Sequence, residues 1–167
     1  MTIMSPIPQT DWFPATNDPA IIGRVVHVKR INETESKKQR KEVYVTLPAI
    51  EHKTAGIQGD VSYALVKEEA DPDTAAQWTR RFAKAWAAYK GAANVVPEGT
   101  ALAEFDGLPD HKAAEFKLHG LTTVEQLAIM SDATCESVGM GARKWRTAAQ
   151  KFLKTRANNG YGYAQQG

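Results

Sequence analysis

The chain of 167 residues lacks the features that would place it in several large protein classes. Its single cysteine, Cys135, excludes an intramolecular disulfide and a zinc site built on several cysteines. No apolar run approaches the ~20 residues that a membrane-spanning helix needs. The first residues lack the basic and apolar regions of a signal peptide, so we expect a protein that is not secreted. With 21 basic and 19 acidic residues the net charge is only +2, so any contact with a polyanion must rest on a local patch.

Motifs of catalysis and cofactor binding are also missing from the sequence. It contains no G-x-S-x-G element, no phosphate-binding P-loop and no dinucleotide fingerprint. The four histidines are dispersed, and His111 and His119 have no carboxylate at metal-ligand spacing. Cys135 has no activating histidine nearby and is expected to be a small buried thiol. We therefore expect a protein that is not an enzyme and that holds no cofactor and no metal.

Residues 1–20 contain four prolines and almost no hydrophobic periodicity, which predicts an extended Pro-rich arm. Trp12 and Phe13 lie inside this arm. Large aromatic side chains on an irregular segment are expected to anchor it, either on the protein's own core or on a neighbouring subunit. Both residues are therefore candidates for anchoring a partner.

Residues 21–92 predict a small β-sheet followed by a helix. Runs rich in β-branched residues at 21–28, 43–47 and 61–66 predict three strands. Pro48 is expected to end the second strand or to mark a sheet edge. The polar stretch before it contains the basic loop Lys37–Lys41, flanked by glutamates, which we interpret as the solvated surface of a hairpin.

A helix is predicted to cover this sheet. Asp71 as N-cap and Pro72 at the first helical position predict its start, and Gly91 predicts its end. Apolar and aromatic residues at helical spacing predict a buried stripe with Trp86 in the core: Trp78, Phe82, Ala85, Trp86 and Tyr89.

A linker is expected at 93–99, a wholly helical module at 100–156 and a low-complexity, flexible tail at 157–167. In the module, residues 118–128 read LHGLTTVEQLA. Gly120 is expected to end one helix, and Thr122 or Thr123 to cap the next, with Glu125 completing a capping box. Ser131 and Asp132 are expected to open a further helix, which leads to the hairpin sequence VGMGA at 138–142.

Residues 107–154 resemble a helix-hairpin-helix module. They are most similar to the N-terminal domain of RadA-type recombinases and to the C-terminal domain of the bacterial RNA polymerase alpha subunit. The family pattern is L-x-x-G-(I/L/F)-x-T-V-E-x-L, which residues 120–127 match from its glycine onward, followed by the glycine hairpin. The resemblance implies an all-α fold whose final helix turns Trp145, Ala148, Ala149, Phe152 and Leu153 inward.

The resemblance implies a phosphate-binding turn, because in helix-hairpin-helix modules the N–H groups of the hairpin contact a phosphate at a helix N-terminus. By that resemblance Gly139 and Gly141 would approach DNA, and Arg143, Lys144 and Arg146 would supply charge from exposed positions. The hairpin is centred on Met140 and the module is rich in acidic residues, which favours structural or protein-binding use over DNA contact.

A second resemblance covers residues 60–156 more loosely and is to small tailed-bacteriophage proteins of unassigned role. It rests on AWAAYK at 85–90, GTALAEF at 99–105 and TVEQLA at 123–128. The expected fold is α+β: a small antiparallel sheet packed on an aromatic helix, then an all-α helix-hairpin-helix-like module, with an extended N-terminal arm. The leading function is a bacteriophage virion protein, a minor head or capsid-decorating component of an oligomeric assembly, with protein partners and no membrane. A DNA-binding accessory protein and a phage regulator of a host protein remain as alternatives.

Overall fold

The computed structural model describes residues 4–92, 95 and 99–166, and its fold class is α+β, as the sequence predicts. The chain divides into two units that interleave along the sequence. Unit 1 consists of Met1–Asn17, Ile22–Lys53 and Val61–Val96. Unit 2 consists of Asp18–Ile21, Thr54–Asp60 and Pro97–Gly167. Unit 2 therefore includes residues 18–21, at the junction of the predicted arm and the predicted β region, and residues 54–60, inside that β region.

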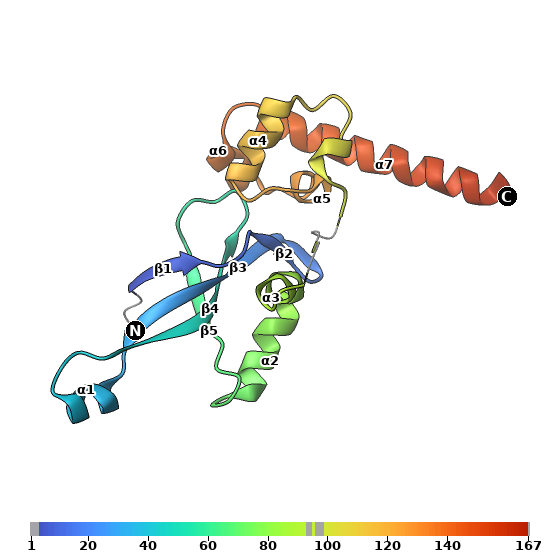
Figure 1. The fold of residues 1–167 in the computed structure, drawn as a ribbon. Coiled ribbons are helices and arrows are strands. Elements are labelled where there is room, and N and C mark those ends of the chain that lie inside the picture. Colours follow the sequence, from blue (N-terminus) through green and yellow to red (C-terminus); the bar gives the residue numbers. More distant parts are fainter. Residues whose placement is uncertain (1–3, 93–94, 96–98, 167) are drawn as a thin grey trace. The chain divides into compact units, whose positions relative to one another are not determined.

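The sheet of unit 1 has five strands, which Figure 1 shows in blue to green. The strands hydrogen-bond in the order β1-β3-β4-β5, and β2 also pairs with β3. The β1–β3 and β4–β5 pairs are antiparallel. The bounds are β1 Met4–Pro8, β2 Phe13–Ala15, β3 Asp18–Ile31, β4 Tyr44–Thr54 and β5 Ser62–Leu65.

The N-terminal segment is part of this sheet, so the prediction of an extended arm at 1–20 is wrong for its described residues. β1 and β2 both pair with β3, and the N–H of Gln9 donates to the carbonyl of Val25 at 2.8 Å. Proline is tolerated in β1 because β1 is an outer strand, where one row of backbone N–H groups is not needed by a neighbour. Pairing of this kind depends on distant residues, which the local proline pattern does not contain.

Two further strand predictions need correction. Pro48 does not end the second strand, because β4 continues through it and its carbonyl accepts the N–H of Val66 at 3.0 Å. Pro48 lies just before the stretch Ala49–His52 that pairs with β5, so its missing N–H interrupts no bond there. The loop at 32–41 contains a short helix, α1 Glu33–Gln39, that joins β3 to β4.

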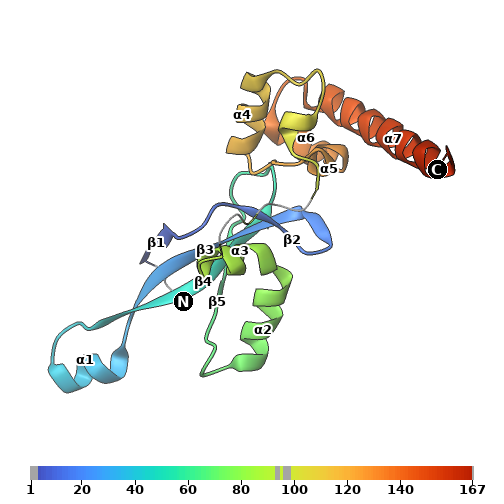
Figure 2. The ribbon, with the colours of Figure 1, turned by 45° about the vertical axis from the view of Figure 1, so that its right-hand side comes forward.

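One face of the sheet is covered by two helices, α2 Pro72–Arg81 and α3 Ala83–Tyr89 (Figure 2). Asp71 caps α2, since its side chain accepts the N–H of Thr74, as predicted. The predicted single helix is broken at Phe82, whose φ of −119° and ψ of 51° are not helical. Gly91, at φ +92°, follows the end of α3 as predicted.

Phe82 is the centre of this layer. It is fully buried, and the ring of His52 on β4 stacks on it at 5.9 Å between centroids. The expectation of a buried Trp86 is wrong: this residue is half-buried, and its ring lies against Tyr89 and under the Lys90 ammonium. The break at Phe82 turns the aromatic stripe, so that Phe82 and Ala85 face the sheet and Trp86 lies at the margin.

The opposite face of the sheet is packed by strand side chains. Side chains alternate between the two faces along a strand. Position 23 of β3 faces Phe82 and the covering helices, so Val26 and Val28 point to the opposite face. They are fully buried together with Ala49 against Leu47, Tyr63 and Leu65. The same face holds the ion pair between Arg24 Nε and Glu51 Oε2, at 2.9 Å.

Unit 2 is helical. Its elements are η1 Leu102–Glu104, α4 Asp110–Leu118, α5 Val124–Ala128, α6 Asp132–Val138 and α7 Ala142–Gln166. The fully or almost fully buried apolar residues include Leu102, Phe116, Leu121, Val124, Leu127, Cys135 and Ala149. Gly120, at φ +79°, ends α4 as predicted, with the N–H of Leu121 donating to the carbonyl of Phe116.

Of the linker predicted at 93–99, only Val95 and Gly99 are among the described residues. The backbone of the tail predicted at 157–167 is helical through Gln166, as an extension of α7. Extending an existing helix costs much less than nucleating one, so a polar end without proline can continue it. Over the part of the chain that the structure describes, no helix is long and apolar enough to cross a membrane.

Candidate functional site

The Gly139–Gly141 turn joins α6 to α7 and is the candidate site that the sequence predicts. Ser131 caps α6, as predicted, by accepting the N–H of Thr134 at 3.1 Å. The helix then ends at Val138, with Gly139 at φ +118° and Gly141 at φ +86°. A Cβ atom at either glycine would meet nothing within 4 Å, so the turn needs glycine for its backbone conformation and not for space.

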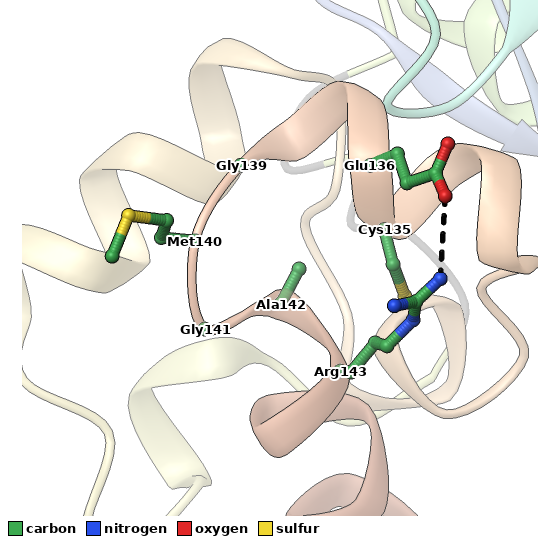
Figure 3. A pocket seen from close by; sticks show the side chains of 7 residues that line it. All are labelled: Cys135, Glu136, Gly139, Met140, Gly141, Ala142 and Arg143. Carbon is green, nitrogen blue, oxygen red and sulfur yellow. Dashed lines mark hydrogen bonds and ion pairs between the residues drawn. The ribbon is translucent and has the colours of Figure 1, made fainter.

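A shallow hollow of about 400 Å³ lies at this turn (Figure 3). Met140 is 95% exposed, and in Figure 3 its side chain points away from the other labelled side chains. Such high exposure is unusual for a hydrophobic side chain. Exposed methionines are typical of binding surfaces that adapt to different partners. The lining residues are Cys135, Glu136, Gly139, Met140, Gly141, Ala142 and Arg143.

The arginines at the start of α7 have carboxylate partners on α6. Arg143 contacts Glu136 at 3.4 Å through Nη2 and Asp132 at 3.7 Å through Nε. Arg146 Nη1 lies 2.9 Å from Asp132 Oδ1 and also donates to the carbonyl of Met130 at 2.9 Å. These pairs are largely exposed and contribute little to stability. They do reduce the positive charge that the turn presents to an anion.

The prediction that all three cations are exposed is wrong for Arg146, whose side chain is 23% exposed. Its guanidinium reaches the carbonyl of Met130, near the end of α5, and so has a structural role. Lys144 is exposed, and its ammonium lies 5.7 Å from the ring centroid of Trp145. Of the predicted set, the two glycines, Arg143 and Lys144 remain near one another at the surface.

Backbone donors at the turn are only partly used. The N–H of Gly139 donates to the carbonyl of Cys135, and that of Ala142 to the carbonyl of Gly139. Among the described residues, the N–H groups of Met140 and Gly141 have no backbone partner. They lie at the N-terminus of α7, where the partial positive charge of the helix favours an anion.

The predicted anchors Trp12 and Phe13 lie in unit 1 and do not behave alike. Phe13 is 6% exposed and lies in β2, so of the two expected roles it has the one in the protein's own core. Trp12 is half-buried, with the Arg24 guanidinium 4.5 Å and the Lys53 ammonium 5.1 Å from its ring centroid. Its indole is therefore already held by two cations of the same unit.

Sequence reasoning missed the role of Gln126, which is 1% exposed. Thr123 caps α5 as predicted, but Gln126 and not Glu125 completes the capping box. Its side-chain oxygen accepts the N–H groups of Thr122 and Thr123, and its Nε2 donates to the carbonyl of Pro19 at 2.9 Å. Glu125 accepts instead from the N–H and hydroxyl of Thr100. The capping-box spacing counted from Thr123 would have indicated Gln126.

Other chemistry is sparse in the part of the chain that the structure describes. There, no group of three His, Cys, Asp or Glu side chains could hold a metal ion. His52 stacks on Trp78 at 4.8 Å between centroids, and burial, together with the Arg81 charge, lowers its pKa. Burial also raises the pKa of Tyr63, which lies near Glu51. His52 lies between the sheet and its covering helices, whereas Tyr63 lies on the opposite face of the sheet.

Comparisons of the chain with protein-family models, with curated protein sequences and with solved structures gave no match.

Proposed function

We propose that the protein is a non-enzymatic bacteriophage virion protein, a minor head or capsid-decorating component. It binds a neighbouring virion subunit through the Gly139–Gly141 turn, is assembled in the host cytoplasm and is carried in the particle. The looser sequence resemblance supports the phage origin. The observation that supports this contact is the 95% exposure of Met140, on a turn whose neighbouring arginines already pair with Glu136 and Asp132.

The partner that fits this turn offers an apolar pocket with a polar rim. The centre of a protein interface is apolar and depleted of charge, and methionine is enriched there. Met140 is suited to the centre of such a contact, and the Arg143–Glu136 pair to its rim. Full burial of a methionine side chain contributes about 1.5–3 kcal/mol.

The test is the amount of the protein in purified phage particles. Met140→Ala keeps the turn and removes most of the apolar side chain, so we expect about a tenfold weaker contact and a correspondingly lower copy number. Leu118→Ala is the matched control, because Leu118 is 87% exposed at the end of α4. Absence of the wild-type protein from particles would refute the virion assignment. A normal copy number for Met140→Ala would refute the turn as the contact.

A DNA-binding accessory protein is the second candidate. It is favoured by the N–H groups of Met140 and Gly141, which have no backbone partner among the described residues, and by Lys144 beside them. On this proposal the variant Arg143→Gln with Lys144→Gln loses duplex DNA binding. The salt titration described below includes that variant.

A further inference from the structure

The segment that joins β3 to β4 is a second candidate surface and belongs to unit 1. We call residues 29–42 the basic hairpin tip; it contains α1 and lies at the end of the β3–β4 hairpin away from α2 and α3 (Figures 1 and 2). No residue of α1 is buried. Polar bonds hold the segment in place: Asn32 Oδ1 accepts the N–H of Glu35 at 3.1 Å, and Ser36 Oγ accepts the N–H of Val43 at 2.9 Å. The tip is therefore ordered without contributing to the core.

The positive charge of the chain is concentrated at this tip. Residues 29–42 contain six basic and three acidic residues, which leaves 15 basic and 16 acidic residues in the rest of the chain. Two of the three carboxylates have partners within the tip or beside it: Glu35 with Lys38 at 3.7 Å, and Glu42 with the hydroxyl of Tyr44 at 2.6 Å. Among the described residues, five cations of the tip have no ion pair: Lys29, Arg30, Lys37, Arg40 and Lys41.

The composition of the tip distinguishes between kinds of partner. Residues 33–42 read ETESKKQRKE and contain no apolar side chain, and Ile31, which is 44% exposed, is the one apolar residue of the tip. A protein partner needs an apolar centre to the contact, whereas interfaces with nucleic acid are polar and strongly positive. The tip therefore fits a phosphate backbone better than it fits a protein surface.

Arg40 lies at the end of α1, within the tip. Arg40 has φ +54° and ψ 34°, the left-handed conformation in which glycine is unstrained and a larger residue is not. Its side chain is exposed and makes no ion pair among the described residues. The left-handed backbone of Arg40 ends α1, of which Arg40 is the C-cap, and its exposed side chain adds to the positive charge of the tip.

We propose that the basic hairpin tip binds the phosphate backbone of nucleic acid without reading its sequence. The cations expected to contact phosphate are the exposed Lys37, Lys38, Arg40 and Lys41. The proposal goes beyond the function proposed above, because it concerns a different surface and a different class of partner. A head component with both surfaces would bind a virion subunit through one and nucleic acid through the other.

The experiment is a salt titration of binding to a fluorescent duplex of about 20 base pairs. Four phosphate contacts predict a slope of log K against log salt near −3.6, or about a 150-fold loss of affinity between 50 and 200 mM salt. Lys37→Gln with Lys41→Gln is expected to reduce the slope by about 1.8. The matched control is Lys67→Gln with Lys117→Gln, which removes the same charge from two exposed lysines elsewhere and should leave the slope nearly unchanged.

Arg40→Gly separates binding from folding. It removes one contact, so the slope should fall by about 0.9, while the relief of strain should leave the thermal midpoint unchanged or higher. The proposal is overturned if the wild type does not bind the duplex at 50 mM salt, or if the Lys67 and Lys117 control weakens binding equally. Loss of binding only in Arg143→Gln with Lys144→Gln also overturns it and assigns DNA to the turn of unit 2. Equal binding of the wild type to an acidic polypeptide of the same length and charge assigns the tip to a protein partner instead.

Discussion

Gly23 and Phe82 form the contact in unit 1 that lends itself best to a quantitative test. Phe82 is fully buried between α2 and α3, and Gly23 faces it from β3. A Cβ atom at Gly23 would stand 2.4 Å from Cδ1 and 2.6 Å from Cε1 of the ring. The φ of Gly23 is outside the left-handed region, so alanine is excluded there by the ring and not by the backbone.

The two single substitutions should each destabilise unit 1. Phe82→Ala leaves a cavity and should cost about 3–5 kcal/mol. Gly23→Ala forces an overlap with a rigid ring and should cost about 1–3 kcal/mol. In the double variant the new methyl group enters the space that the ring left. Alanine also restricts the unfolded chain more than glycine does, by about 0.4–1 kcal/mol. The double variant should therefore be more stable than Phe82→Ala alone, with a coupling of about 2 kcal/mol or more.

The assay is urea unfolding followed by tryptophan fluorescence in a Trp145→Phe background. The remaining tryptophans, at 12, 78 and 86, all lie in unit 1, so the signal reports that unit. If the two single effects add to within about 0.5 kcal/mol in the double variant, Gly23 and Phe82 are not in contact and the packing of α2 and α3 described above is wrong.

Two further predictions concern groups that the sequence did not single out. Gln126→Leu leaves the N–H groups of Thr122 and Thr123 and the carbonyl of Pro19 without their partner, so it should cost about 2–4 kcal/mol in urea unfolding followed by far-ultraviolet circular dichroism. Gln150→Leu, which removes one exposed bond to Ala128, is its control and should cost less than about 1 kcal/mol; equal losses would contradict the role of Gln126. Burial and Arg81 lower the pKa of His52 below its ordinary value of 6.5, so protonation favours the unfolded chain. The contribution of His52 to the free energy of unfolding should be complete above pH 6.5 and should decline as the pH falls below that value. The variant His52→Phe should therefore show a smaller fall in thermal midpoint between pH 7 and pH 5 than the wild type. An unchanged pH profile in that variant would refute the assignment.

The parts of the fold that the sequence predicts are those set by neighbouring residues. Helix starts at Asp71, Thr123 and Ser131 depend on one side chain and an N–H three positions later. The ends at Gly91 and Gly120 depend on one backbone conformation. Each of these could be placed because the interaction is completed within a few residues.

The parts that the sequence did not predict depend on distant residues. Whether Phe13 is an anchor for a partner or a core residue depends on the pairing of β2 with β3. The depth of Trp86 depends on the break at Phe82. At the candidate site, the glycines follow from the local pattern, whereas the pairing of Arg146 with Asp132 and Met130 requires the packing of α7 beside the end of α5. A local sequence pattern shows which chemical groups these residues carry, but it does not show which distant residues they contact in the fold.

The interleaving of the two units has a consequence for biosynthesis. Segments 18–21 and 54–60 leave the ribosome early but belong to a unit whose other part, residues 97–167, is translated last. At 5–20 residues per second, the 71 residues of that part take roughly 4 to 14 s to make. For the first part of that time, until residues 126, 134 and 138 have been made, the carbonyl of Pro19 lacks its donor on Gln126, and Gly56 lacks the Thr134 and Val138 side chains that lie beside it in the finished protein. The ends of β3 and β4 near Pro19 and Gly56 therefore stay without these partners until α5 and α6 have been made.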